Sequence, residues 1–66
     1  MKIYLNGKEL LLNPETTLKQ LIDNEGLGER RLAAEVNQEI ITKSDHSSFI
    51  LSDGDMVEIV HAIGGG

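Results

Sequence analysis

The chain contains no cysteine among its 66 residues. It can therefore form no disulfide, which fits a reducing compartment, and it has no thiolate to bind a metal or act as a nucleophile. Any sulfur that it handles must be attached elsewhere. Basic residues are also few, because six Lys and Arg stand against eleven Asp and Glu for a net charge of −5. This balance argues against nucleic acid as a partner. It is explained equally well by a partner with a basic surface and by an acidic surface that serves only solubility.

Long hydrophobic runs are missing as well. No segment approaches the roughly 20 apolar residues of a membrane span, and the N-terminus turns polar at Asn6, too soon for a signal peptide. We therefore expect a cytoplasmic protein that does not contact the membrane. With 66 residues, 39% of them hydrophobic, the chain is expected to form one small domain over residues 1–66 with one modest core.

Residues 3–12 predict a β-hairpin about Asn6-Gly7, the strongest short hairpin signal. A two-residue turn places Ile3 opposite Leu10 and sets the register of the two strands. One face should then be buried and the other mostly solvated. The face predicted to be buried carries Met1, Ile3, Leu5, Leu10 and Leu12.

A short helix is predicted after Asn13-Pro14, which ends the hairpin. Thr17 and Gln20 have the spacing of a capping box, and Gly26 supplies a left-handed stop. About two turns of helix are marginal alone, so we expect packing on a sheet to hold this one. The apolar stripe that would make this contact is formed by Leu18, Leu21 and Ile22.

The remaining segments predict three more strands. Residues 32–36 and 39–41 indicate a second hairpin around Asn37-Gln38, residues 42–48 a polar loop, and residues 56–63 a strand rich in β-branched residues. The last strand is expected in the centre, beside the first. The resulting fold class is α+β, a mixed sheet of about five strands packed on one helix.

Candidate catalytic groups are few. His46 lies in a polar loop beside Ser44 and Asp45, but neighbours in one loop rarely reach triad geometry, which depends on spatial roles. His61 is expected to be an outward surface residue, since a metal site needs three or four converging ligands. The segment Asp53–Asp55 lacks the further carboxylates of a calcium loop and is interpreted as a turn. We expect no catalytic residue, no metal and no bound cofactor.

No phosphate-binding pattern of the G-x-x-x-x-G-K type occurs in the chain. If ATP enters the chemistry of this protein, we therefore expect another chain to bind it.

The chain ends in Gly64-Gly65-Gly66 directly behind an apolar strand. Glycine has no Cβ, so such a tail is narrow and conformationally permissive. Extended, it spans about 10 Å, enough to thread a carboxylate into a partner's active site. Once adenylated by ATP, that carboxylate could be attacked by a sulfur nucleophile to give a thiocarboxylate. A frayed terminus or a linker remnant is the alternative interpretation.

Three segments together resemble the ThiS family, the sulfur carrier proteins of thiamine biosynthesis. They are residues 3–7, residues 36–41 and, most specific of the three, residues 53–66. The resemblance covers essentially all 66 residues without an insertion. The short middle fits this family better than the longer small subunits of molybdopterin synthase, which share the fold. The resemblance implies a ubiquitin-like β-grasp fold with a flexible tail over residues 63–66.

The resemblance also implies a chemistry for the tail. Gly66 would be adenylated by an E1-like, ThiF-type enzyme and converted to a thiocarboxylate, with the sulfur coming from a donor through a partner. The sulfur would pass to a ThiG-type thiazole synthase for the thiazole ring of thiamine. Gly64 and Gly65 would thread into the partner's active site, with Gly64 the weaker match to the family. The residues implied to dock on the partners are Val60, Ala62 and Ile63.

In this interpretation the chain is a protein cosubstrate and not an enzyme, and it is monomeric when free. The residues themselves leave other functions open. These are a sulfur carrier for molybdopterin or another thiolation pathway, a ubiquitin-like modifier that forms isopeptide bonds, and an interaction module with an inert tail.

Overall fold

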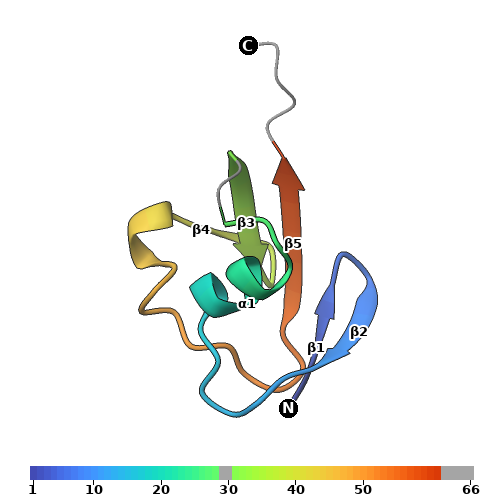
Figure 1. Ribbon diagram of the computed structural model, residues 1–66. Helices are drawn as coiled ribbons and strands as arrows, with labels where there is room; N and C mark the ends of the chain where they lie inside the picture. The colour runs from blue at the N-terminus through green and yellow to red at the C-terminus, as the bar shows by residue number, and fades with distance from the viewer. Residues whose placement is uncertain (29–30, 62–66) are drawn as a thin grey trace.

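The computed structural model describes residues 1–28 and 31–61. Five strands form one mixed sheet in the order β2-β1-β5-β3-β4, and the single helix among these residues, α1, lies across one face of the sheet (Figure 1). The expected fold class is therefore confirmed. No helix of the described residues has both the length and the apolar character needed to cross a lipid bilayer. The elements are β1 (Lys2–Leu5), β2 (Lys8–Leu11), α1 (Leu18–Asn24), β3 (Leu32–Val36), β4 (Glu39–Ile41), the 3₁₀ turn η1 (Lys43–Asp45) and β5 (Met56–His61).

Strand β5 occupies the centre of the sheet, as expected (Figure 1). It runs parallel to β1, with Leu5 beside Val57, and antiparallel to β3, with register from Leu32 opposite His61 to Val36 opposite Val57. The predicted strand over residues 56–63 is observed from Met56 to His61, where the described part of the chain ends. The final strand in the sequence thus joins the two hairpins.

Both hairpins turn through two residues with positive φ. The first uses Asn6 at 50° and Gly7 at 84°, and the second uses Asn37 at 52° and Gln38 at 70°. Two consecutive left-handed residues give the type I′ turn, whose twist matches that of the strands. The register of the first hairpin is the predicted one, with Ile3 opposite Leu10.

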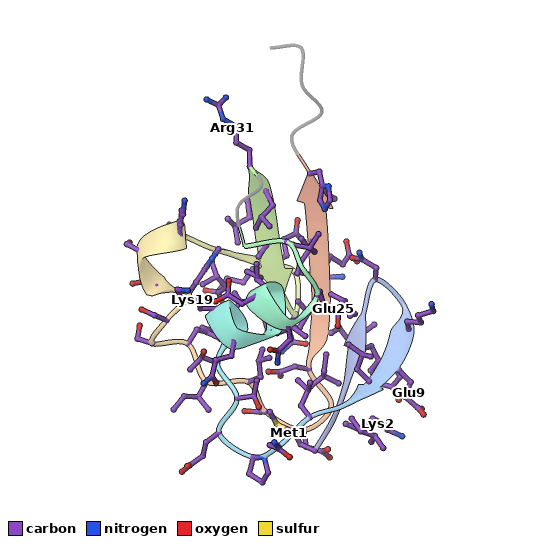
Figure 2. The ribbon with its side chains drawn as sticks, in the orientation of Figure 1. Met1, Lys2, Glu9, Lys19, Glu25 and Arg31 are labelled. Carbon is purple, nitrogen blue, oxygen red and sulfur yellow. The ribbon has the colours of Figure 1, made fainter. Side chains whose placement is uncertain are left out.

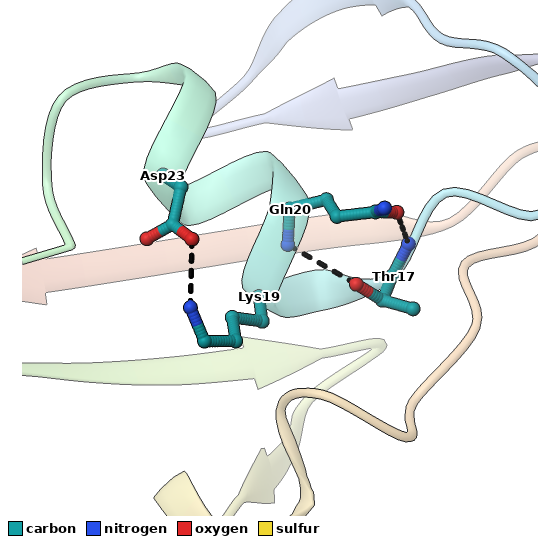
Figure 3. Close-up of polar contacts among 4 residues, drawn as sticks. All are labelled: Thr17, Lys19, Gln20 and Asp23. Atoms are coloured by element: carbon teal, nitrogen blue, oxygen red, sulfur yellow. Dashed lines mark hydrogen bonds and ion pairs between the residues drawn. The ribbon is translucent and has the colours of Figure 1, made fainter.

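The capping box of α1 is present in full (Figure 3). The Thr17 hydroxyl accepts a hydrogen bond from Gln20 N at 3.1 Å, and the Gln20 side chain accepts one from Thr17 N at 2.9 Å. Lys19 and Asp23, one turn apart, form an ion pair with a 2.8 Å Nζ–Oδ2 distance. Beyond the helix, Gly26 takes the left-handed conformation with φ of 76°. Local hydrogen bonds thus define both ends of a seven-residue helix.

The core fills the space between α1 and the sheet. It includes the three predicted helix residues, and Leu51 reaches it from the loop before β5. Because the helix covers only one face, the other face of the sheet carries little of the core. The buried apolar side chains are Ile3, Leu18, Leu21, Ile22, Ala34, Val36, Leu51, Val57 and Ile59.

His46 departs from the sequence-based expectation. The segment was expected to be a polar loop, but it contains η1, and His46 is only 7% exposed. Its Nε2 lies 3.0 Å from the carbonyl oxygen of Ile41, and because a carbonyl only accepts, Nε2 must carry the hydrogen. The imidazole thus closes the η1 turn against the end of β4. A hydrogen bond to a backbone carbonyl gives it a structural role rather than a place in a Ser-His-Asp triad.

Candidate functional site

Five residues that the sequence assigned to the site lie outside the described residues. These are the two expected docking residues Ala62 and Ile63 and the three glycines Gly64, Gly65 and Gly66. The structure therefore describes the site as far as His61, at the end of the strand that leads to them. His61 is exposed, as expected.

The side chains of β5 alternate between the core and solvent. Val57 and Ile59 are buried beneath α1, whereas Met56, Glu58 and Val60 are exposed. Val60 is 61% exposed, so the accessibility required of a docking residue is confirmed, and its docking role stays a prediction. The strand holds the core with one side and presents Val60 with the other.

The sheet face opposite α1 is called the open face below. Its members follow from the alternation along each strand and from the register between strands. Although solvated, it carries several large apolar side chains: Leu11, Ile40, Met56 and Val60 are all more than half exposed. The residues of the open face are Lys2, Tyr4, Glu9, Leu11, Ala33, Glu35, Ile40, Met56, Glu58 and Val60.

Two glutamates stand opposite each other at the middle of the open face. Glu35 on β3 stands directly opposite Glu58 on β5, and like charges in this relation destabilise a sheet. Within residues 1–28 and 31–61, neither carboxylate forms an ion pair. The centre of the open face therefore combines apolar side chains with uncompensated negative charge.

An ion pair lies toward one end of the open face, on the first hairpin. Lys2 Nζ is 3.5 Å from Glu9 and 5.8 Å from the centre of the Tyr4 ring. The Glu9 carboxylate, and to a lesser extent Tyr4, raise the pKa of Lys2 above its ordinary value. Figure 2 shows Lys2 and Glu9 on the first hairpin and Arg31 at the opposite end of the molecule. Lys2 and Arg31 thus lie toward opposite ends of the sheet, whereas Lys19, also labelled, lies on α1.

The described residues contain no cluster of side chains that could hold a metal ion, because nowhere in ranges 1–28 and 31–61 do three His, Asp or Glu side chains gather closely enough. A pocket of about 570 Å³ lies beside α1 and η1, with Lys19, Ile22, Lys43 and His46 in its lining. It is on the helix side of the sheet, so it is separate from the open face.

Sequence reasoning did not identify the Glu35–Glu58 pair. Both glutamates occupy solvent-facing positions of predicted strands, which the alternation indicates. The register between β3 and β5 makes them neighbours, and no local pattern specifies that register.

Comparison with known proteins places these features in a family. The profile of the ThiS family matches residues 2–66. The sulfur carrier protein ThiS of Bacillus subtilis (strain 168) is 37% identical over 65 residues, which cover 97% of this chain and 98% of that protein. A thiazole synthase from Paramagnetospirillum magneticum (strain ATCC 700264 / AMB-1) is 39% identical over all 66 residues. This chain spans only 20% of that longer protein, and the same share of a thiazole synthase from Magnetococcus marinus that is 35% identical.

A solved structure agrees with the sequence match. The crystal structure of the thiamine biosynthesis protein ThiS from Geobacter metallireducens superimposes with a TM-score of 0.83 and 25% sequence identity, with full coverage of both chains. This likeness confirms the ubiquitin-like β-grasp fold that the sequence resemblance implied. The family profile, the relative of nearly equal length and the solved structure agree. This chain therefore belongs to the ThiS family.

Proposed function

We propose that this chain is a sulfur carrier protein whose Gly66 carboxylate is adenylated and then converted to a thiocarboxylate. The thiocarboxylate supplies the sulfur for the thiazole ring of thiamine, in the cytoplasm. The observation that carries the proposal is the match, over nearly the whole length of both chains, to a protein named as sulfur carrier ThiS. The matches to thiazole synthases favour thiazole over molybdopterin as the destination of the sulfur.

The chemistry requires a free carboxylate at Gly66. Attack of its oxygen on the α-phosphorus of ATP forms an acyl-adenylate and releases pyrophosphate. A sulfide ion then forms a bond to the acyl carbon, and AMP leaves with the oxygen that linked it. Gly64 and Gly65 have no side chains to obstruct this reaction, and in this role the chain is a cosubstrate and not a catalyst.

The proposed partners are an E1-like, ThiF-type activating enzyme, a ThiG-type thiazole synthase and a protein that delivers the sulfur. The open face supports docking because it joins exposed apolar side chains to the strand that leads to Gly66. Val60, together with Ala62 and Ile63, is proposed to contact the partner. The carboxylates of Glu35 and Glu58, which form no ion pair within residues 1–28 and 31–61, favour a partner surface that carries arginine or lysine.

The decisive experiment measures the intact mass of the purified protein after incubation with ATP, sulfide and a ThiF-type enzyme. We expect a mass increase equal to the exchange of one oxygen for one sulfur, and no change in a variant that lacks Gly66. An unchanged wild-type mass, with an enzyme shown to activate another carrier, would contradict the proposal. Covalent adducts that survive denaturation would instead indicate a ubiquitin-like modifier.

A further inference from the structure

Asn6 uses its side chain as an additional element of the sheet. Its Oδ1 accepts a hydrogen bond from Ile59 N at 2.9 Å, and its Nδ2 donates one to Ile59 O at 3.2 Å. A primary amide that accepts and donates in this way supplies both kinds of bond that a neighbouring strand would provide. The backbone N of Asn6 donates to Val57 O at 2.8 Å. Asn6 thus extends the contact between β1 and β5 from Val57 to Ile59.

This extension falls where β1 leaves the sheet. The chain turns at Asn6 and Gly7, so within the described residues no strand accompanies β5 beyond Val57 on this side. On its other side, β5 remains paired with β3 as far as His61. The N–H and C=O of Ile59 both bond to the Asn6 side chain, so among the described residues Asn6 is the last partner of β5 on the β1 side, and β3 alone pairs with the residues that follow Ile59.

We propose that Asn6 is a positioning residue for the activation of Gly66, an inference that rests on the proposed function. Gly66 is the seventh residue after Ile59 and the ninth after Val57. Without the Asn6 amide, β5 has hydrogen-bond partners on both sides only as far as Val57. About 7 Å more of the chain is then paired with β3 alone. Val60 directly follows Ile59 and is the one proposed docking residue that the structure describes. Asn6 therefore restricts the positions that the end of β5 can adopt when the docking surface and the tail bind to the activating enzyme.

The second hairpin provides a matched control. Asn37 occupies the equivalent position of its own type I′ turn, with φ of 52°, and its side chain also bonds to β5, accepting from Met56 N at 3.0 Å. This contact is at the start of β5, far from Gly66 in the sequence. Asn6→Gly and Asn37→Gly both keep a residue that tolerates positive φ, and each removes one side-chain amide that bonds to β5, at Ile59 and at Met56 respectively.

Two measurements on the full chain test the proposal. Amide hydrogen exchange should accelerate at Ile59, Val60 and His61 in Asn6→Gly but not in Asn37→Gly. For adenylation by the ThiF-type enzyme, Asn6→Gly should lower kcat/KM about tenfold, because backbone that is less restrained in the free protein must be ordered on binding, while Asn37→Gly stays near wild type. Asn6→Asp keeps the acceptor and loses the donor, so it should lie between wild type and Asn6→Gly.

The outcomes separate this inference from the proposed function. If wild type is adenylated and Asn6→Gly is equally active, or if Asn37→Gly loses as much activity, Asn6 has no special positioning role. If Asn6→Gly is too unstable to assay, Asn6→Asp decides by the same two measurements. If wild type is not adenylated, the proposed function itself fails, and the positioning role fails with it.

Discussion

Glu35 and Glu58 face each other across the β3–β5 ladder, and they do so on the face of the sheet that α1 leaves uncovered. A stable sheet gains from opposite charges at such a position and loses from like charges. The pair is therefore expected to lower the stability of the sheet, which agrees with the docking role proposed for this face.

The first prediction concerns this pair. Glu58→Gln should raise the free energy of unfolding by about 0.2–1 kcal/mol, because it removes the repulsion from Glu35. Urea denaturation at low salt measures the gain, which should shrink as salt screens the charges. Glu9→Gln is the control, because Glu9 is paired with Lys2 and its loss should bring no gain. Equal stabilisation by both variants would indicate a general effect of net charge.

The same substitution should weaken activation. If the open face meets a basic partner surface, Glu58→Gln should raise the KM for the carrier in adenylation and reduce the dependence of that KM on salt. A more stable protein with an unchanged KM would place the docking surface elsewhere.

Neighbouring residues of β5 should separate folding from docking. Ile59 is 5% exposed within the core, so Ile59→Ala should cost about 2–5 kcal/mol of stability, a large part of what a small domain possesses. Val60→Ala, on the exposed side, should change stability by less than about 0.5 kcal/mol while raising the KM for activation. Thermal or urea unfolding and adenylation kinetics test the pair, and a large stability loss in Val60→Ala would contradict the assignment of faces.

The cap of α1 gives a prediction about local stability. Thr17→Ala removes the hydroxyl that accepts from Gln20 N and should cost about 0.5–2 kcal/mol. Thr17→Ser keeps the hydroxyl and should remain close to wild type. Urea unfolding compares the two, and equal losses would show that the Thr17 methyl group, rather than the cap, is responsible.

Gln38 should be a site for stabilisation. It holds φ at 70° in the second position of a type I′ turn, where glycine is preferred. Gln38→Gly relieves the left-handed strain, of roughly 1–2 kcal/mol, against an entropic cost of about 0.5–1 kcal/mol. We expect a net gain of about 0.5–1 kcal/mol by thermal unfolding. A loss would mean that the Gln38 side chain makes a stabilising contact that outweighs the strain.

Local chemistry explains why much of this fold could be predicted. The Asn6-Gly7 turn and the spacing of Thr17 and Gln20 are short-range signals, and each produced the element that it predicted. The β-branched composition of the last segment predicted a strand, and its central position was expected because it is not needed to close a local hairpin. These features depend on residues close together in the sequence or on burial alone.

The features that sequence reasoning missed depend on long-range register or on solvent exclusion. Asn6 and Ile59 are 53 residues apart, so nothing local indicates that a turn asparagine also serves as a sheet partner. His46 lies among polar residues, and its burial against the end of β4 results from the path of the chain through η1. The candidate site was predicted from the glycine tail alone. The structure adds the open face of the sheet, which includes exposed residues of the strand that leads to the tail.

The parallel pairing of β1 with β5 also has a mechanical consequence. A pull on the end of β5, with the start of β1 held, slides the two strands past each other, so the load is shared among the bonds to Asp55, Val57 and Ile59. Bonds loaded together in shear resist far more force than bonds that peel apart one at a time. A partner that draws in the chain beyond His61 would therefore pull on a stiff body, and force spectroscopy should record a single high unfolding force.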